Sequence, residues 1–227
     1  MTKSGITLHF IRHGETYFNF YDRVQGWGNT PLTEQGIKDA RRSGKGLEDL
    51  EFDAVYTSDL ARTVETAEII LGENNKTADD IEITQMPEFR EIFFGSYEGG
   101  FNDDAFMAVA DHLGYETKED LLANVHDAER MEVFKELDPH GHAENFDEFW
   151  ERLEKGLNKV IENHPDTEED ILIVAHGGTI RLLLEKIVPE LKDPEDLKNA
   201  SLSTVHYEDG EFKLDCYGQV SHFASLD

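Results

Sequence analysis

Short apolar runs recur along the chain and are separated by longer stretches with helical spacing. The runs at residues 6–12, 52–57, 81–86 and 171–175 have the length and composition of strands. The last of these is continuously apolar, which is the pattern of a strand buried on both faces. The run at 81–86 is followed by Pro87, so we expect it near an edge of the sheet.

Helical periodicity fills most of the segments between these runs. Thr33 is a candidate N-cap for a helix that extends toward Leu50. Ser58 or Asp59 is the candidate cap of a second helix, which continues to Leu71 with apolar residues on one face. The same spacing predicts further helices over residues 144–162 and 177–188.

Strands that alternate with helices predict an α/β fold, a three-layer sandwich around a mostly parallel central sheet. A hairpin of residues 204–207 and 212–217 around Asp209–Gly210 is expected to complete the sheet. Residues 101–145 have a helical pattern interrupted by glycine and proline, and they carry no strand signal. We therefore expect one domain over residues 1–227, with residues 101–145 as an inserted helical lid.

The chain is strongly acidic. Its 227 residues include 21 lysines and arginines against 49 aspartates and glutamates, for a formal net charge of −28. Such a surface repels nucleic acid and anionic membranes at long range, so we expect neither as a partner. It also repels a phosphate ester, and a phosphate site in this chain therefore requires a local cluster of positive charge.

Cysteine usage and the N-terminal segment bear on the compartment. The single cysteine, Cys216, has no partner for an internal disulfide, as expected in a reducing environment. The apolar run at residues 6–11 is too short for a signal sequence or a membrane span. We expect a cytoplasmic protein, and the sequence leaves open whether it is a monomer or a dimer.

Two histidines occupy matching places in the predicted sheet. His13 directly follows the first predicted strand, His176 directly follows the fourth, and a glycine comes after each. Ligands of open α/β sheets bind beyond the carboxyl ends of the strands, and Gly177–Gly178 also precedes a helix, whose free N–H groups suit an anion. Either histidine alone would be interpreted as structural. Their shared setting, with Arg12 beside His13, indicates an anion site.

Arg12 and His13 stand in the segment of residues 11–16. With Asn19, this segment resembles the Arg-His-Gly-Glu signature of the histidine phosphatase superfamily, whose fold is called phosphoglycerate mutase-like. Further segments resemble those of the family in the same order, and the likeness covers about residues 6–99 and 144–181. The segments are 23–27 with 31–36, 56–67, 89–91 with Gly95 and 98–99, and 174–181.

The resemblance implies that His13 is the nucleophile, which attacks phosphorus as a neutral imidazole and carries the phosphoryl group transiently. Nearby guanidinium groups favour the neutral ring, and we expect a backbone carbonyl to hold its other nitrogen. Glu91 is implied as general acid and base. Arg12, Arg62 and His176 are implied to bind the phosphoryl oxygens. Lesser phosphate contacts are expected from Asn19, Gln25, Gly26 and the N–H group of Gly177.

This set requires no metal and no cofactor. Asp138, His140 and His142 are residue types that bind metals, but they lie in a Pro/Gly loop without further ligands at a telling spacing. We therefore predict no metal site. The aromatic residues near Glu91 are expected either to line the leaving-group pocket or to pack the lid on the core. They are Phe93, Phe94, Tyr97, Phe101 and Phe106.

Three functions are compatible with the resemblance: a phosphatase for a small phosphate monoester, a bisphosphate-dependent phosphoglycerate mutase, and a non-catalytic phospholigand-binding protein of the same fold. A mutase needs a second cationic site, whereas residues 101–145 contain 12 acidic residues and only Lys118, Arg130 and Lys135 as basic ones. Gln25 also resembles the phosphatase pattern more than the mutase pattern. Because the implied catalytic set is intact, we expect a hydrolase, a metal-independent phosphatase.

Overall fold

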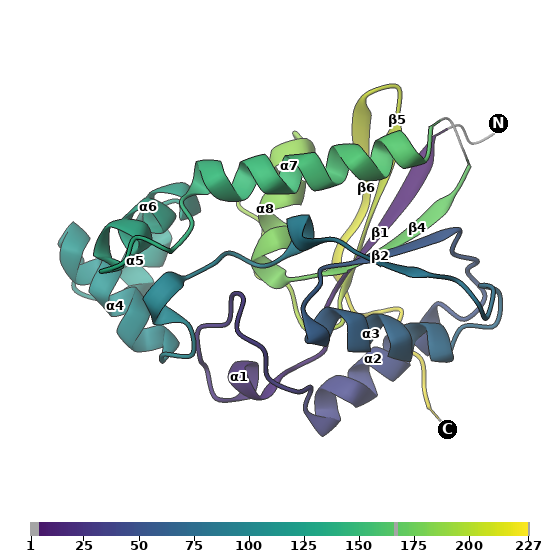
Figure 1. The fold of residues 1–227 in the computed structure, drawn as a ribbon, viewed down its shortest axis with the longest axis horizontal. Helices are drawn as coiled ribbons and strands as arrows, with labels where there is room; N and C mark the ends of the chain where they lie inside the picture. Colours follow the sequence, from purple (N-terminus) through teal and green to yellow (C-terminus); the bar gives the residue numbers. More distant parts are fainter. Residues whose placement is uncertain (1–4, 166–167, 227) are drawn as a thin grey trace.

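Within residues 5–165 and 168–226, which the computed structural model describes, six strands form one mixed sheet (Figure 1). Their order is β3-β2-β4-β1-β5-β6. The first four are parallel neighbours, and β5 and β6 add an antiparallel hairpin at the edge next to β1. The mostly parallel sheet and the edge position of β3 are confirmed. The strands are β1 (Ile6–Arg12), β2 (Ala54–Thr57), β3 (Ile83–Gln85), β4 (Asp170–Ala175), β5 (Leu202–Glu208) and β6 (Glu211–Gln219).

Helices cover both faces of the sheet and make the three predicted layers (Figure 1). Helices α7 (Phe146–Asn163) and α8 (Gly177–Ile187) lie on one face, and α2 (Glu34–Gly46) and α3 (Ala61–Gly72) lie on the other. A separate hydrophobic core fills each space between helices and sheet.

The continuous apolar run of β4 is explained by its central position between these two cores. Ile171 and Ile173 belong to the core under α7 and α8, whereas Leu172 and Val174 belong to the core against α2 and α3. All four side chains are fully buried. Because successive side chains of a strand point to opposite faces, a strand covered on both sides needs an apolar residue at every position.

The segment expected as a lid contains helices and no strand in its described structure. Helices α4 (Asn102–Leu113), α5 (Lys118–Asn124) and α6 (Asp127–Leu137) gather at one end of the molecule (Figure 1). They enclose a small core of their own. Phe134 of α6 meets the rings of Phe94 and Phe106 edge-on, with centroids 5.4 and 5.3 Å away. Three short elements precede this segment: α1 (Tyr17–Phe20) and the 3₁₀ turns Pro87–Phe89 and Gly95–Tyr97.

One predicted helix cap is confirmed and another is wrong. The Thr33 side chain accepts a hydrogen bond from the Gly36 N–H and caps α2 as expected. Helix α3, however, begins at Ala61 with Leu60 in the cap position, and neither Ser58 nor Asp59 caps it. Ser58 and Asp59 instead form hydrogen bonds with side chains of other segments.

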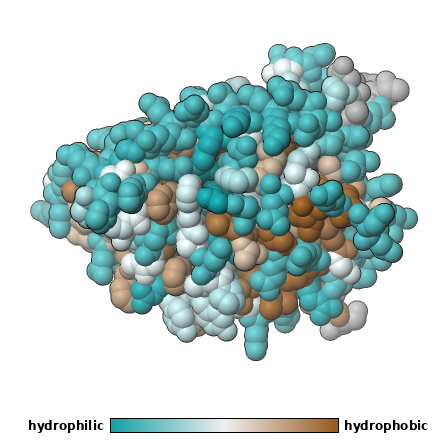
Figure 2. Space-filling model, in the orientation of Figure 1, coloured by the Kyte–Doolittle hydropathy of each residue, from teal (hydrophilic) through white to brown (hydrophobic). Residues whose placement is uncertain are grey.

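The face of the molecule drawn in Figure 2 is mostly polar. Figure 2 shows hydrophilic residues over most of one face, with hydrophobic residues gathered in patches, the largest right of centre. Among the described residues, the most exposed large apolar side chain is Phe20. No helix in residues 5–165 and 168–226 combines the length and apolarity that crossing a membrane requires.

Candidate active site

The pairing of β1 with β4 brings the two strand-end histidines together. Arg12 is paired with Ala175 in these parallel strands, so His13 and His176 leave the sheet at the same edge. The N–H of His13 donates to the Ala175 carbonyl at 3.0 Å. The two imidazole rings lie edge to face with centroids 5.3 Å apart. This is close enough for both rings to bind one small ligand.

The orientation of the His13 ring is fixed by a single backbone contact. Nδ1 lies 2.8 Å from the carbonyl oxygen of Gly14 and donates its proton to it, as predicted. The neutral ring therefore keeps its lone pair on Nε2. Burial, with the nearby guanidinium groups of Arg62 and Arg12, lowers the pKa of His13 well below its ordinary value of 6.5. His13 is accordingly a neutral imidazole at neutral pH, which is the form that can attack phosphorus.

His176 is held from the opposite side by a hydroxyl group that the sequence patterns did not indicate. Its Nε2 lies 2.8 Å from Oγ of Ser58, which in turn lies 2.8 Å from Oγ1 of Thr63. Burial, with Arg62 and His13 nearby, lowers the pKa of His176 well below 6.5. Ser58 was predicted as a helix cap, but its partner is His176, which follows a strand far along the chain.

The two guanidinium groups are held mainly by backbone carbonyl oxygens. Arg12 donates to the carbonyl of Leu197. Arg62, in the first turn of α3, donates to the carbonyls of Gly26 and Gly28 at 2.6 and 2.9 Å. Burial lowers the pKa of Arg62 to about 10, so the group remains a cation at neutral pH.

Three buried nitrogens of this cluster have no hydrogen-bond partner within the described part of the chain. They are Nε of Arg12, Nε of Arg62 and Nδ1 of His176. Buried donors without a partner cost about 1–3 kcal/mol each. An anion that accepts hydrogen bonds from them would offset this cost, so the cluster has the properties of an oxyanion site.

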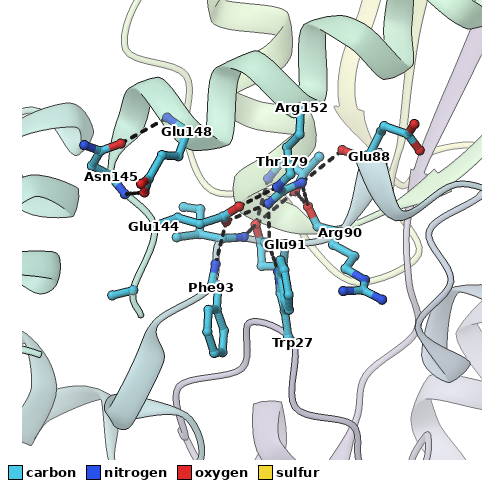
Figure 3. Close-up of polar contacts among 12 residues, drawn as sticks. Trp27, Glu88, Arg90, Glu91, Phe93, Glu144, Asn145, Glu148, Arg152 and Thr179 are labelled. Carbon is cyan, nitrogen blue, oxygen red and sulfur yellow. Dashed lines mark hydrogen bonds and ion pairs between the residues drawn. The ribbon is translucent and has the colours of Figure 1, made fainter. Parts of the chain in front are cut away.

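Glu91 approaches the same cluster and rests on the N-terminus of α8. Its carboxylate accepts hydrogen bonds from the N–H groups of Gly178 at 2.9 Å and Thr179 at 3.0 Å. Its Oε1 also lies 3.1 Å from the hydroxyl oxygen of Thr179 (Figure 3). A Cβ atom on Gly178 would lie 2.8 Å from Oε1 of Glu91, so a side chain there would shift the carboxylate. Thr179 is a site residue that the motifs did not single out.

Five of the predicted residues line one cavity of about 270 Å³: Arg12, Asn19, Gln25, Glu91 and Gly177. Oδ1 of Asn19 accepts from the Thr16 N–H, and Oε1 of Gln25 accepts from the Thr16 hydroxyl. The backbone of Gly177 lies against Arg12, because a Cβ there would be 3.1 Å from Arg12 Nε.

The remaining predicted residues are more deeply buried. His13, Arg62 and His176 are each at most 3% exposed. Gly26 has a different place: its N–H donates to the Glu98 carboxylate at 3.2 Å, and its carbonyl accepts from Arg62. In this structure Gly26 therefore orients Arg62 and does not present its own amide to the cavity.

The far side of the cavity is formed by the 101–145 segment and by α8. Phe106 and Phe134 contribute apolar surface there, and Arg130 and Arg181 contribute charge. Both arginines bind Asp127: Arg181 through two nitrogens at 3.0 and 2.7 Å, and Arg130 through one at 2.7 Å. Of the five aromatic residues expected near Glu91, Phe94 and Phe106 line the cavity, and both also pack on the core of the segment.

In the Asp138-x-His140-x-His142 loop, the Asp138 side chain binds backbone N–H groups of the same loop. The Asp138 carboxylate accepts hydrogen bonds from the N–H groups of His142 and Ala143 at 2.7 and 2.9 Å. Over the described ranges, no group of three or more histidine, cysteine, aspartate or glutamate side chains is arranged to hold a metal ion.

Comparison with known proteins places this geometry in a family. The family model described as histidine phosphatase superfamily (branch 1) matches residues 8–220. The chain is 30% identical over 219 residues to a Bacillus subtilis protein named uncharacterized phosphatase PhoE, covering 95% of this chain and 96% of that one. It is 29% identical over 220 residues to an Arabidopsis thaliana protein named metal-independent phosphoserine phosphatase, covering 95% and 82% respectively.

Among solved structures, the chain resembles a crystal structure named phosphoglycerate mutase from Bacillus anthracis. The TM-score is 0.90 at 32% identity, and the match covers 96% of this chain and 95% of that one. Relatives with phosphatase names and relatives with mutase names thus share this fold.

Proposed function

The chain belongs to the histidine phosphatase superfamily (branch 1), and on this premise we propose that it is a metal-independent phosphatase for a small phosphate monoester. His13 is its nucleophile and carries the phosphoryl group. One observation carries the proposal: the His13 ring, with Nδ1 bound to a carbonyl, lies among three donor groups that each have one buried nitrogen without a partner in the described structure. This arrangement fits a phosphoryl group and the charge that spreads over its oxygens during transfer.

The first step forms a phosphohistidine. Nε2 of His13 attacks phosphorus in line, the P–N bond forms, and the bond between phosphorus and the leaving oxygen breaks. Glu91 gives its proton to the leaving oxygen, so that an alcohol departs. Arg12, Arg62 and His176 hold the three equatorial oxygens by donating hydrogen bonds to them.

The second step returns the enzyme to its starting state. A water molecule takes the place of the alcohol, and the Glu91 carboxylate accepts one of its protons as the oxygen attacks phosphorus. The P–N bond breaks, inorganic phosphate leaves, and His13 is again neutral. Proton and phosphoryl group are thus balanced over the two steps without a cofactor.

Residues 101–145 act as the lid over this site. The segment supplies Asn102, Phe106, Asp127, Arg130, Met131 and Phe134 to the wall of the cavity. Its apolar side chains exclude water from the leaving-group side, and its polar side chains select the leaving group. The 1–227 chain works as one domain in this proposal, because sheet and lid residues meet in the same cavity.

Phosphoglycerate mutase activity is the second candidate, favoured by the Bacillus anthracis structure and by the arginines of the cavity. A mutase must retain a bisphosphate, which requires cations free to meet the second phosphate. Arg130 and Arg181 are already bound by Asp127, so their charge is partly cancelled. For these two arginines the pairing supports transfer to water over transfer to a second hydroxyl group. Arg23, which donates to the Gly99 carbonyl, is a further cation on the cavity wall.

The test uses purified protein, an aryl phosphate and a chelator. We expect hydrolysis in EDTA, an acid-labile phosphoenzyme, and a loss of at least about a thousandfold in kcat for His13→Ala. His140→Ala, at an exposed histidine, is the matched control and should retain activity. Phosphate transfer between hydroxyls of phosphoglycerate, dependent on a bisphosphate primer, would instead establish the mutase. A folded wild-type protein that neither hydrolyses esters nor becomes phosphorylated would overturn both and leave a phospholigand-binding protein.

A further inference from the structure

Arg152, on the inner face of α7, contacts the backbone on both sides of Glu91. Its guanidinium donates to the carbonyl of Glu88 at 2.9 Å, of Arg90 at 2.8 Å and of Glu91 itself at 2.8 Å (Figure 3). The Glu88 carbonyl lies in the 3₁₀ turn Pro87–Phe89, and the carbonyls of Arg90 and Glu91 lie in the irregular segment that follows it. These carbonyls accept no sheet hydrogen bond, so the side chains that bind them help to determine the shape of the segment.

Glu144 holds Arg152 in place from the opposite direction. Its two carboxylate oxygens accept from Nε of Arg152 at 2.6 Å and from a terminal nitrogen at 2.8 Å. It also accepts from the N–H of Phe93 at 2.9 Å. Both side chains are largely buried, at 17% and 11% exposed. The five N–H donors of the guanidinium are thereby all directed at acceptors.

Side chains from two other parts of the chain also donate hydrogen bonds to this segment. The indole N–H of Trp27 donates to the Glu91 carbonyl at 2.9 Å, and the hydroxyl of Thr179 donates to the Arg90 carbonyl at 2.9 Å. The backbone of Glu91 is therefore fixed by Arg152 and Trp27, while its carboxylate is fixed by the α8 N-terminus. Arg152 is the group that binds three of these carbonyls at once.

We propose that Arg152, oriented by Glu144, is a positioning residue for Glu91: it fixes the backbone from which the carboxyl group reaches the leaving oxygen. The inference rests on the proposed role of Glu91 as general acid and base. Because Glu144 lies at the end of the 101–145 segment, the pair also links the position of this acid to the lid. Lysine cannot replace arginine here, since an ammonium group lacks the planar fork that meets several acceptors in one plane.

The test compares two esters that differ in their need for a proton. An aryl phosphate releases a stabilised phenolate and depends weakly on general acid catalysis, whereas an alkyl phosphate releases an alkoxide and depends on it strongly. The quantity to compare is kcat/KM, which reports the phosphorylation step. We expect Arg152→Lys to lower kcat/KM for the alkyl ester by about tenfold to a hundredfold, as expected for a catalytic group misplaced by about 1 Å. The aryl ester should lose less than about threefold.

Three further variants and a control make the result specific. Glu91→Gln should show the same selectivity for the aryl ester, and the double variant Arg152→Lys/Glu91→Gln should lose little more on the alkyl ester than Glu91→Gln alone. Glu144→Gln, which keeps the shape of the side chain, should produce a weaker form of the Arg152→Lys effect. Arg41→Lys, at an exposed arginine paired with Glu73, is the control and should leave both esters unchanged.

The outcomes separate this inference from the proposed function. Selective loss in Glu91→Gln together with equal or no loss on the two esters in Arg152→Lys would overturn the positioning role and leave the function intact. Absence of selectivity in Glu91→Gln would overturn the role of Glu91, and the inference with it. Should Arg152→Lys fail to fold, Glu144→Gln decides the matter by the same ratio of the two kcat/KM values.

Discussion

Glu98 provides a sharp test of how the site is held together. Its carboxylate accepts hydrogen bonds from the N–H groups of Gly26, Trp27, Gly28 and Phe94 at 2.9–3.2 Å. Three of these amides belong to the loop whose carbonyl oxygens bind Arg62. We predict that Glu98→Ala destabilises the protein and disorders this loop, with a loss of the proposed phosphatase activity as the second effect.

The magnitude follows from the number of bonds and from exposure. A hydrogen bond to a charged group contributes about 1.5–3 kcal/mol, so four give a gross value of about 6–12 kcal/mol. Glu98 is only partly buried, and the freed amides of the loop gain water. We therefore expect Glu98→Ala to lower the free energy of unfolding by about 3–4 kcal/mol. Glu98→Gln keeps one acceptor oxygen and should cost about half as much.

Urea unfolding followed by circular dichroism measures this effect, and the midpoint should fall without a change in slope. At this chain length the melting temperature should drop by roughly 6–16 °C for Glu98→Ala. Glu82→Gln, at an exposed glutamate, is the control and should change stability by less than about 0.5 kcal/mol. An unchanged midpoint for Glu98→Ala would show that the loop is held by other contacts.

Three further predictions concern the histidines and the glycine of the site. Ser58→Ala leaves the buried Nε2 of His176 without its partner, and kcat should fall about tenfold with the circular dichroism spectrum unchanged. Gly177→Ala places a Cβ 3.1 Å from Nε of Arg12 and should raise KM about tenfold by displacing the guanidinium; an unchanged KM would contradict the proposed oxygen contact. The pKa values of His13 and His176 are lowered in the folded state, so the unfolded chain binds more protons below about pH 6.5. The contribution of these two histidines to the free energy of unfolding is fully present above that pH. It should fall by up to about 1.4 kcal/mol per pH unit for each histidine as the pH is lowered. Urea unfolding between about pH 7 and pH 5.5 measures this loss.

The layers of the fold could be predicted because they depend on local patterns. The apolar run of β4 has core on both faces, and the spacing of Phe149, Leu153 and Leu157 matches the buried face of α7. The first residues of the helices were harder to predict from the sequence. Ser58 and Asp59 have the side chains of a helix cap, but His176 and Arg90 are their partners in the fold, and a local pattern contains neither partner.

The candidate site divides in the same way. His13 and His176 were predictable because each follows a strand and precedes glycine, and adjacent parallel strands place such residues side by side. Arg152 was not predictable, because the sequence around it in α7 does not distinguish it from a solvent-exposed helical arginine. Its importance comes from three carbonyls about sixty residues earlier in the chain, and it becomes visible only when α7 is packed on the sheet.

The arginines of this acidic chain use two kinds of partner. Arg130 and Arg181 bind the carboxylate of Asp127, and Arg90 binds that of Asp59. An ion pair of this kind orients both side chains but cancels most of their field at a distance.

The two arginines next to His13 are held differently. Arg12 is oriented by the carbonyl of Leu197, and Arg62 by the carbonyls of Gly26 and Gly28. A carbonyl group fixes a guanidinium through its hydrogen bond without neutralising it, because its dipole carries no net charge. The positive charge therefore remains available beside the histidine ring, where the low dielectric of the interior strengthens its action on an anion. In the described structure no carboxylate is hydrogen-bonded to either guanidinium, and Glu91 acts on both without such a bond. A chain with a net charge of −28 can therefore attract a phosphate ester to this point.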